Sequence, residues 1–160
     1  MAKNLFYSII RWVIVIAVVL SLGVGGGSGS VSKADPREVA AAVTAELDMS
    51  QMLEGDNQLI KRFYGIDPAQ YESCILYYPT TNMMAEELLI VKLKDNSQQE
   101  AVRKAAEKRI ETQKTTFEGY GVEQFEMLTN NAVIEIRGNY VLFVVSPYAS
   151  AAQKAFLKAL

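Results

Sequence analysis

The sequence predicts an α+β fold: an antiparallel sheet of about four strands, formed as two hairpins with helices to one side, preceded by one N-terminal transmembrane or signal helix. Three observations carry this prediction. The chain opens with a long apolar run, apolar residues then recur at helical spacing to about residue 64, and short aromatic and branched runs follow in two pairs. The predicted element order is ααββα-ββα.

Residues 1–24 are predicted to form a membrane anchor or signal segment. From Trp12 to Val24 all but two residues are apolar, and extending the run back to Leu5 gives twenty residues. Twenty helical residues span about 30 Å, the thickness of the hydrocarbon core. The preceding basic residues place the N-terminus inside and the C-terminal domain outside. We therefore expect a single-pass protein of the cytoplasmic membrane that contacts the lipid bilayer through residues 5–24.

The alternative is a cleaved secretory signal, because a basic start, a short apolar stretch and then small residues are also typical of signal peptides. The domain would then be secreted. Both interpretations export it, with residues 25–34 as a Gly/Ser tether and residues 35–160 as the exported domain.

Two helices are expected at the start of the domain. Asp35 and Pro36 suit the first turn of a helix that runs to about Met49, since aspartate accepts hydrogen bonds from free amides and proline lacks one. A second, shorter helix follows Asp56 and stops at Gly65.

The first strand pair is predicted at residues 71–78 and 86–93, joined by the loop Pro79–Glu86. The second of these strands is apolar on both faces, so we expect it to be central and covered on both sides. Asn96 or Ser97 is expected to cap a long helix after it. That helix runs to about Phe117 with an inner stripe at Val102, Ala106, Ile110, Gln113 and Phe117.

The C-terminal part continues with a short helix or turn at 122–128 and a hairpin of residues 132–137 and 140–146. Gly138 and Asn139 link the two strands, and both residue types tolerate the positive φ of a tight turn. A helix over 149–160 closes the domain.

Composition argues against several function classes. The chain has no histidine, which is the usual general base and the commonest metal ligand. After residue 34 it carries 13 basic and 18 acidic residues, so a nucleic-acid partner is not expected. Its one cysteine, Cys74, lies in a predicted strand and is expected to be buried and inert. Glu86 and Glu87 should point to opposite faces of their strand. We therefore expect no enzyme activity, no catalytic residues, no cofactor and no metal.

Five residues are candidates for an interaction surface. Arg109 and Gln113 share one helix face, where they could meet a ligand carboxylate or a partner strand, or satisfy backbone groups at the sheet edge. Tyr78, Met83 and Met84 belong to the stretch Tyr77–Glu86, whose side chains suit adaptable contacts, although core packing is equally plausible for some of them.

Two stretches, "RIETQKTTFEGYGVEQFEML" and "AVIEIRGNYVLFVVS", are similar to a known family. The matching positions are Arg109, Gln113, Phe117, Tyr120, Gly138, Asn139, Tyr140 and Val141. The chain resembles the domain-of-unknown-function 4358 family of uncharacterised exported Gram-positive bacterial proteins, from about Asp35 to Ser146. The resemblance implies export behind an N-terminal anchor or lipoprotein signal, although the lipoprotein cysteine is absent here. It implies no activity and no catalytic residues.

These observations favour a membrane-anchored or secreted non-enzymatic domain that takes part in protein–protein interaction at the cell envelope. Two alternatives remain: a small-molecule-sensing or solute-binding domain, and a carboxylate-dependent hydrolase. A flat exposed patch near residues 77–86 would favour the first function, and a deep apolar pocket with convergent polar groups would favour the second. A carboxyl group in a cleft with a strongly raised pKa would favour the hydrolase.

Overall fold

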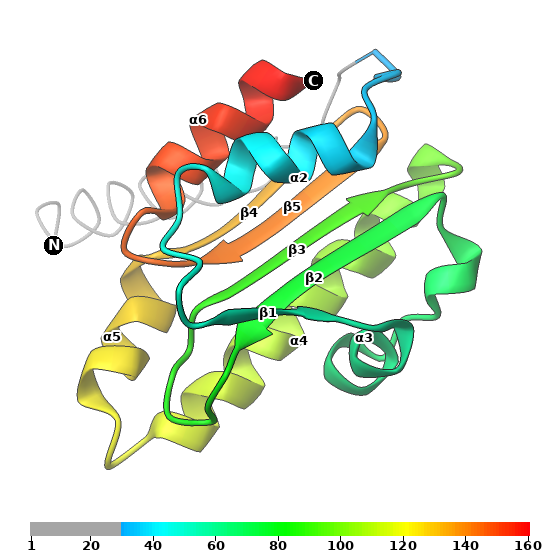
Figure 1. The fold of residues 1–160 in the computed structure, drawn as a ribbon. Helices are drawn as coiled ribbons and strands as arrows, with labels where there is room; N and C mark the ends of the chain where they lie inside the picture. Colours follow the sequence, from blue (N-terminus) through cyan, green and yellow to red (C-terminus); the bar gives the residue numbers. More distant parts are fainter. Residues whose placement is uncertain (1–29) are drawn as a thin grey trace, which may run out of the picture.

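A computed structural model describes residues 30–160 of the chain (Figure 1). The predicted anchor or signal segment and residues 25–29 of the tether lie outside the described residues. Within residues 30–160, no helix combines the length and the apolar character needed to cross a membrane. The elements are α2 (Pro36–Thr44), β1 (Met52–Gly55), α3 (Asn57–Tyr64), η1 (Pro68–Gln70), β2 (Ser73–Pro79), β3 (Glu87–Lys92), η2 (Asn96–Gln98), α4 (Gln99–Phe117), α5 (Val122–Asn130), β4 (Ala132–Arg137), β5 (Tyr140–Val145) and α6 (Ala149–Ala159).

The sheet is antiparallel, as predicted, but it has five strands in the order β1-β2-β3-β5-β4. The sequence prediction missed β1, which pairs with the end of β2 so that Leu53 lies opposite Tyr78. Only four residues long and ending in glycine, β1 is too short to show the alternation that identifies a strand. The helix before it ends at Thr44 rather than near Met49, because the chain turns there towards the sheet edge.

Helices cover both faces of the sheet, which corrects the expectation that they lie to one side. Figure 1 shows α2 and α6 over one face and α3, α4 and α5 over the other. Two hydrophobic cores result. Leu88 and Ile90 of β3 pack under α2 and α6, while Leu89 and Val91 pack on the opposite side. All six residues of β3 are buried, so the prediction of a central strand covered on both sides is confirmed.

Local capping signals account for the start of α2 and for both ends of α3. Asp35 and Asp56 accept hydrogen bonds from the first-turn amides of α2 and α3, and Gly65 ends α3 with φ 69°, as predicted. The long helix differs, because its cap is Asp95 rather than Asn96 or Ser97. Asp95 accepts from the Ser97 amide, and the Gln98 side chain reaches back to Asp95, so the helix begins with a 3₁₀ turn.

The β4–β5 turn has positive φ at Gly138 alone, and Asn139 does not adopt the positive φ that the sequence suggested. This is the pattern of a type II′ hairpin turn. The buried Asn139 side chain instead holds the backbone of Ser32. Its Oδ1 accepts from the Ser32 amide at 2.8 Å, and its Nδ2 donates to the Ser32 carbonyl at 3.2 Å. Asn139 therefore connects the hairpin to the start of the domain.

Residue Ala34 is held at the same end of the sheet. Its carbonyl accepts from the Tyr140 hydroxyl at 2.7 Å and from Lys92 Nζ at 3.2 Å. Residues 32–34, which the sequence assigns to the tether, thus lie against the end of β3 that carries Lys92. We call this the proximal end of the sheet, and the end at Glu87 the distal end. Five steps of β3 separate Glu87 from Lys92, roughly 17 Å along the strand.

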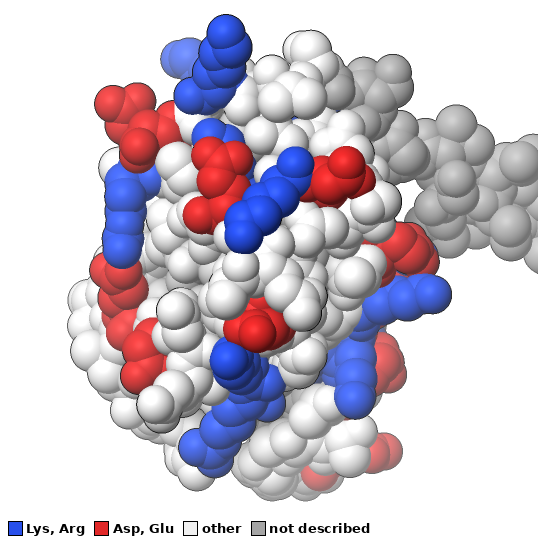
Figure 2. Space-filling model, turned by 90° about the vertical axis from the view of Figure 1, so that its right-hand side faces the viewer, with Lys and Arg blue, Asp and Glu red and all other residues white. Residues whose placement is uncertain are grey.

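Charges are mixed over the side of the domain that Figure 2 shows, where Lys and Arg side chains are interspersed with Asp and Glu. Several charged side chains of the domain form ion pairs, among them Arg103 with Glu100 and Glu107 on α4. No single sign of charge dominates this face.

Candidate functional site

A buried carboxylate, Glu87, organises the polar groups at the distal end. It is the first residue of β3 and only 1% exposed. Arg109 of α4 donates to both carboxylate oxygens, from Nε to Oε1 at 3.0 Å and from Nη2 to Oε2 at 2.7 Å. The Tyr64 hydroxyl donates to Oε1, and Gln113 Nε2 lies 3.4 Å from Oε2. The charge of Glu87 is thus balanced by one cation and solvated by two neutral donors.

Packing fixes the orientation of Arg109 in this cluster, and burial keeps Tyr64 protonated. The Arg109 guanidinium carbon lies 4.1 Å from the centroid of the Phe63 ring, a cation–π contact that fixes the plane of the guanidinium. Burial, and then the charge of Glu87, raise the pKa of Tyr64 well above its ordinary value. The Tyr64 hydroxyl therefore stays protonated and available as a donor to Glu87.

Helical spacing predicts that Arg109 and Gln113 share one helix face, and in the structure both contact Glu87, which was not among the predicted site residues. The acidic group that they meet belongs to the protein itself, and it lies 22 residues from Arg109 in the sequence. One signal was available, because a carboxylate within a strand covered on both faces must have a buried partner.

A cleft opens beside this cluster, between α3, α4 and the β2–β3 loop, with a volume of about 520 Å³. Four of the five predicted surface residues line it: Tyr78, Met84, Arg109 and Gln113. The remaining lining residues are Leu59, Arg62, Phe63, Pro79, Thr80, Thr81, Asn82 and Thr116. The two charged residues of the lining are both arginines, whereas the domain as a whole is acidic.

Met83 does not line the cleft but belongs to a neighbouring group of exposed hydrophobic side chains. We call this group the distal surface, and it consists of Met83, Tyr120, Val122, Phe125 and Tyr148, which are 37–67% exposed. Met83 belongs to the β2–β3 loop, Tyr120 to the α4–α5 turn and Tyr148 to the β5–α6 connection, while Val122 and Phe125 belong to α5.

Contacts around α5 tie the segments of the distal surface to one another. The Ala85 amide donates to Gln124 Oε1 at 2.8 Å, which joins the β2–β3 loop to α5. Pro147, next to Tyr148, lines a hollow together with Glu123 and Glu126 of α5. The distal surface therefore includes α5 and the two segments beside it, the β2–β3 loop and the β5–α6 connection.

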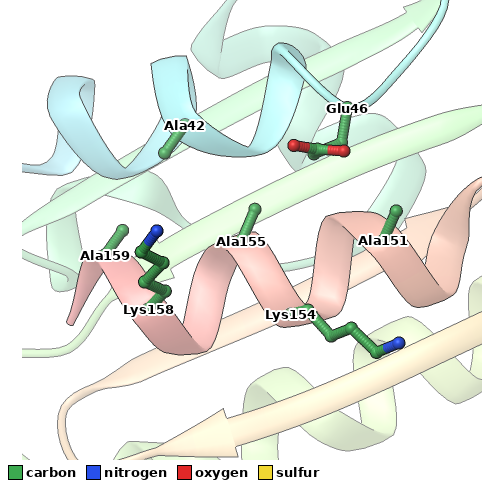
Figure 3. Close-up of a pocket in the computed structure, with 7 residues that line it drawn as sticks. All are labelled: Ala42, Glu46, Ala151, Lys154, Ala155, Lys158 and Ala159. Atoms are coloured by element: carbon green, nitrogen blue, oxygen red, sulfur yellow. The ribbon is translucent and has the colours of Figure 1, made fainter.

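A second hollow, of about 540 Å³, lies on the other face between α2 and α6 (Figure 3). Ala42 of α2 and Ala155 of α6 point towards each other across it, whereas Lys154 extends away. Its remaining lining residues are Glu46, Ala151, Lys158 and Ala159. Small side chains rather than convergent polar groups form this hollow, so we attribute it to the packing of the two helices.

The groups with chemical reactivity lie apart from the cleft. Cys74 of β2 is half-buried, and burial raises its pKa to about 12. Burial, and then Asp48, raise the pKa of Glu86, but Glu86 does not line the cleft. No group of three or more His, Cys, Asp or Glu side chains placed to hold a metal ion occurs within residues 30–160. What the cleft offers is an apolar wall with arginine, amide and hydroxyl groups, an arrangement suited to binding.

Comparison with known proteins gives one match. A family model described as "Domain of unknown function (DUF4358)" matches residues 45–146, which run from the end of α2 through β5 and include the buried cluster and the cleft. No curated protein and no solved structure matches the chain.

Proposed function

Because this chain belongs to the DUF4358 family, whose description names no activity, we propose a role from its surface: a non-enzymatic interaction domain, exported and held at the outer face of the cytoplasmic membrane. In this proposal the distal surface binds another protein of the cell envelope. Residues 5–24 act as the anchor, and residues 32–34 connect the anchor to the domain.

One observation carries the proposal. Among residues 30–160, seven large hydrophobic side chains are exposed, and five of them form the distal surface. Of the other two, Leu53 lies on the edge strand β1 and Val31 belongs to the tether. Exposed apolar groups gathered at one end of a domain are typical of a protein-binding surface, since their burial by a partner is favourable.

The position of residues 32–34, which connect the predicted anchor to the domain, supports the same role. The hydrogen bonds from Asn139 and Tyr140 hold residues 32–34 at the proximal end of the sheet. An anchor that precedes these residues places the proximal end towards the membrane and the distal surface away from it. That orientation leaves the distal surface accessible to other proteins outside the membrane.

Site-specific photo-crosslinking in the cells that make the protein tests this proposal. A benzophenone amino acid is placed at Met83 or Tyr120 on the distal surface, and at Val31 as the control. Met83 is 59% exposed, Tyr120 57% and Val31 67%, so the three probes are similarly accessible. We expect Met83 and Tyr120 to crosslink to one common protein that Val31 does not capture.

The double variant M83S/Y120S should also lose this partner, while V31S retains it. Identical capture from all three positions would contradict the proposal.

A small-molecule-binding role is the second candidate, and the volume of the cleft favours it. About 520 Å³ lies within the range of ligand pockets, and apolar and polar groups converge on it. A thermal-shift screen of metabolites against the full chain and a T81W variant, in which a large side chain fills the cleft, tests this role. A ligand that stabilises the wild type by several degrees and the variant not at all would support it.

A further inference from the structure

We propose that the cleft binds an acidic peptide segment of the partner protein, in which a carboxylate side chain lies next to an apolar one. This inference rests on the proposed function and assigns a chemical class to what the cleft accepts. It is argued from the charges, the free donors and the apolar wall of the cleft.

The charge of the cleft is the first argument. Arg109 is neutralised by Glu87, but Arg62 takes part in none of the ion pairs within residues 30–160. Among residues 30–160, no acidic side chain lines the cleft. The cleft thus presents one uncompensated positive charge in a domain with an excess of acidic residues. An acidic segment would be attracted to this position, whereas the net negative charge of the domain disfavours its binding elsewhere.

The second argument is that one guanidinium nitrogen of Arg109, Nη1, is available to donate a hydrogen bond to a ligand. Its Nε and Nη2 donate to Glu87, whereas Nη1 forms no hydrogen bond with the described residues. No fully buried side-chain nitrogen or oxygen in residues 30–160 lacks a partner, so Nη1 is at least partly exposed to solvent. Because Arg109 lines the cleft and its plane is fixed by Glu87 and Phe63, Nη1 is a donor held in place before any ligand arrives.

The apolar wall is the third argument. Leu59, Phe63, Tyr78 and Met84 line the cleft, and the Phe63 and Tyr78 rings meet edge to face with centroids 6.0 Å apart. A free inorganic anion would leave this wall uncovered, whereas a peptide fills it with a neighbouring apolar side chain. The β2–β3 loop both lines the cleft and carries Met83 of the distal surface, so one segment of a partner can contact both.

The test is a selection of random 12-residue peptides, displayed on phage, against the full chain in detergent micelles. We expect the enriched peptides to contain Asp or Glu beside Leu, Ile, Phe or Met. Synthetic copies should bind the R62Q variant at least tenfold more weakly than the wild type, with affinity that falls as salt rises. The K154Q variant, which removes an exposed cation from the other face, should bind them as the wild type does. Arg62 and Lys154 are both exposed, so neither change is expected to affect folding.

Further variants separate failure of this inference from failure of the proposed function. If enriched peptides lose binding to T81W but are not acidic, or bind R62Q normally, the ligand class is wrong and the interaction role stands. If N-acetylglutamate alone displaces the peptides at concentrations at which they bind, the cleft is a site for small carboxylates and the peptide inference is overturned. If no peptide is enriched, or binding is unchanged in T81W, the peptide inference is overturned, whereas the proposed function fails only if crosslinking captures the same proteins from Met83, Tyr120 and Val31.

Discussion

Replacing Glu87 with glutamine should destabilise the domain by about 3 kcal/mol, because it leaves the Arg109 guanidinium buried without its counter-charge. The two side chains are 1% and 12% exposed. Removing one partner of such a pair costs about 3–5 kcal/mol, and the lower value applies here because glutamine can still accept the hydrogen bond from Tyr64. R109M should cost a similar amount, since it leaves the Glu87 carboxylate without a cation.

The double variant E87Q/R109M distinguishes this reasoning from a simple loss of packing. It removes both charges, so we expect its loss of stability to be smaller than the sum of the single losses by at least about 2 kcal/mol. Urea unfolding followed by far-ultraviolet circular dichroism measures all three variants. With a slope of about 2 kcal/mol per molar urea, a loss of about 3 kcal/mol lowers the midpoint by roughly 1.5 M.

The chain contains a matched control for this experiment. Arg103 and Glu100 on α4 form the same two-pronged contact, from Nε at 2.9 Å and from Nη2 at 2.7 Å, but their side chains are 40% and 54% exposed. Because solvent screens this pair, E100Q should leave the midpoint unchanged within experimental error. A shift in E87Q no larger than that in E100Q, or strict additivity in E87Q/R109M, would refute the role of burial.

Three further predictions concern other parts of the domain. Burial raises the pKa of Cys74 from 9.0 to about 12, so the native thiol should react slowly with iodoacetamide at pH 8, and stability should decline as pH rises from about 9 towards 12. N139A removes two hydrogen bonds to the tether, so trypsin should cleave after the exposed Lys33 about tenfold faster. G121A places a methyl group 2.5 Å from the buried Phe117 ring and should cost about 1–3 kcal/mol, measured by urea unfolding.

Each of these predictions has an outcome that contradicts it. Equal rates of thiol alkylation in native and urea-unfolded protein would show that Cys74 is accessible in the fold. Trypsin cleavage of N139A at the rate seen for N82A, a change in the exposed β2–β3 loop, would show that the contacts to Ser32 do not restrain the tether. An unchanged urea midpoint for G121A would mean that the α4–α5 turn relaxes to admit the methyl group.

The elements that were predictable from the sequence are those whose capping or turn residues lie within a few residues of the backbone groups they contact. Asp35 and Asp56 cap their helices through amides two or three residues away, and Gly65 ends a helix through its own left-handed φ. The β4–β5 hairpin is equally local, because two residues close it. The edge strand β1 escaped prediction, since its four residues form a strand only because β2 offers an unpaired edge.

In the candidate site, too, local features were predicted and long-range contacts were not. Helical spacing alone placed Arg109 and Gln113 on one face, and loop composition singled out Tyr78 and Met84, all of which line the cleft. Their common partner Glu87 was not identified, because nothing in the residues around it indicates which helix packs over the start of β3. The unsatisfied charge of a buried carboxylate could be anticipated, but the identity of its partner could not.

By itself, then, the sequence determined the caps at Asp35, Asp56 and Gly65, the two hairpins, the central strand and the face of α4 that carries the polar pair. Only the tertiary structure decided that helices cover both faces of the sheet, that Arg109 neutralises Glu87, and that Asn139 holds Ser32, 107 residues away. The physical reason is that capping and turn formation are settled by neighbouring backbone groups. A buried polar group is instead satisfied by whichever distant side chain the packing of layers brings within hydrogen-bond distance.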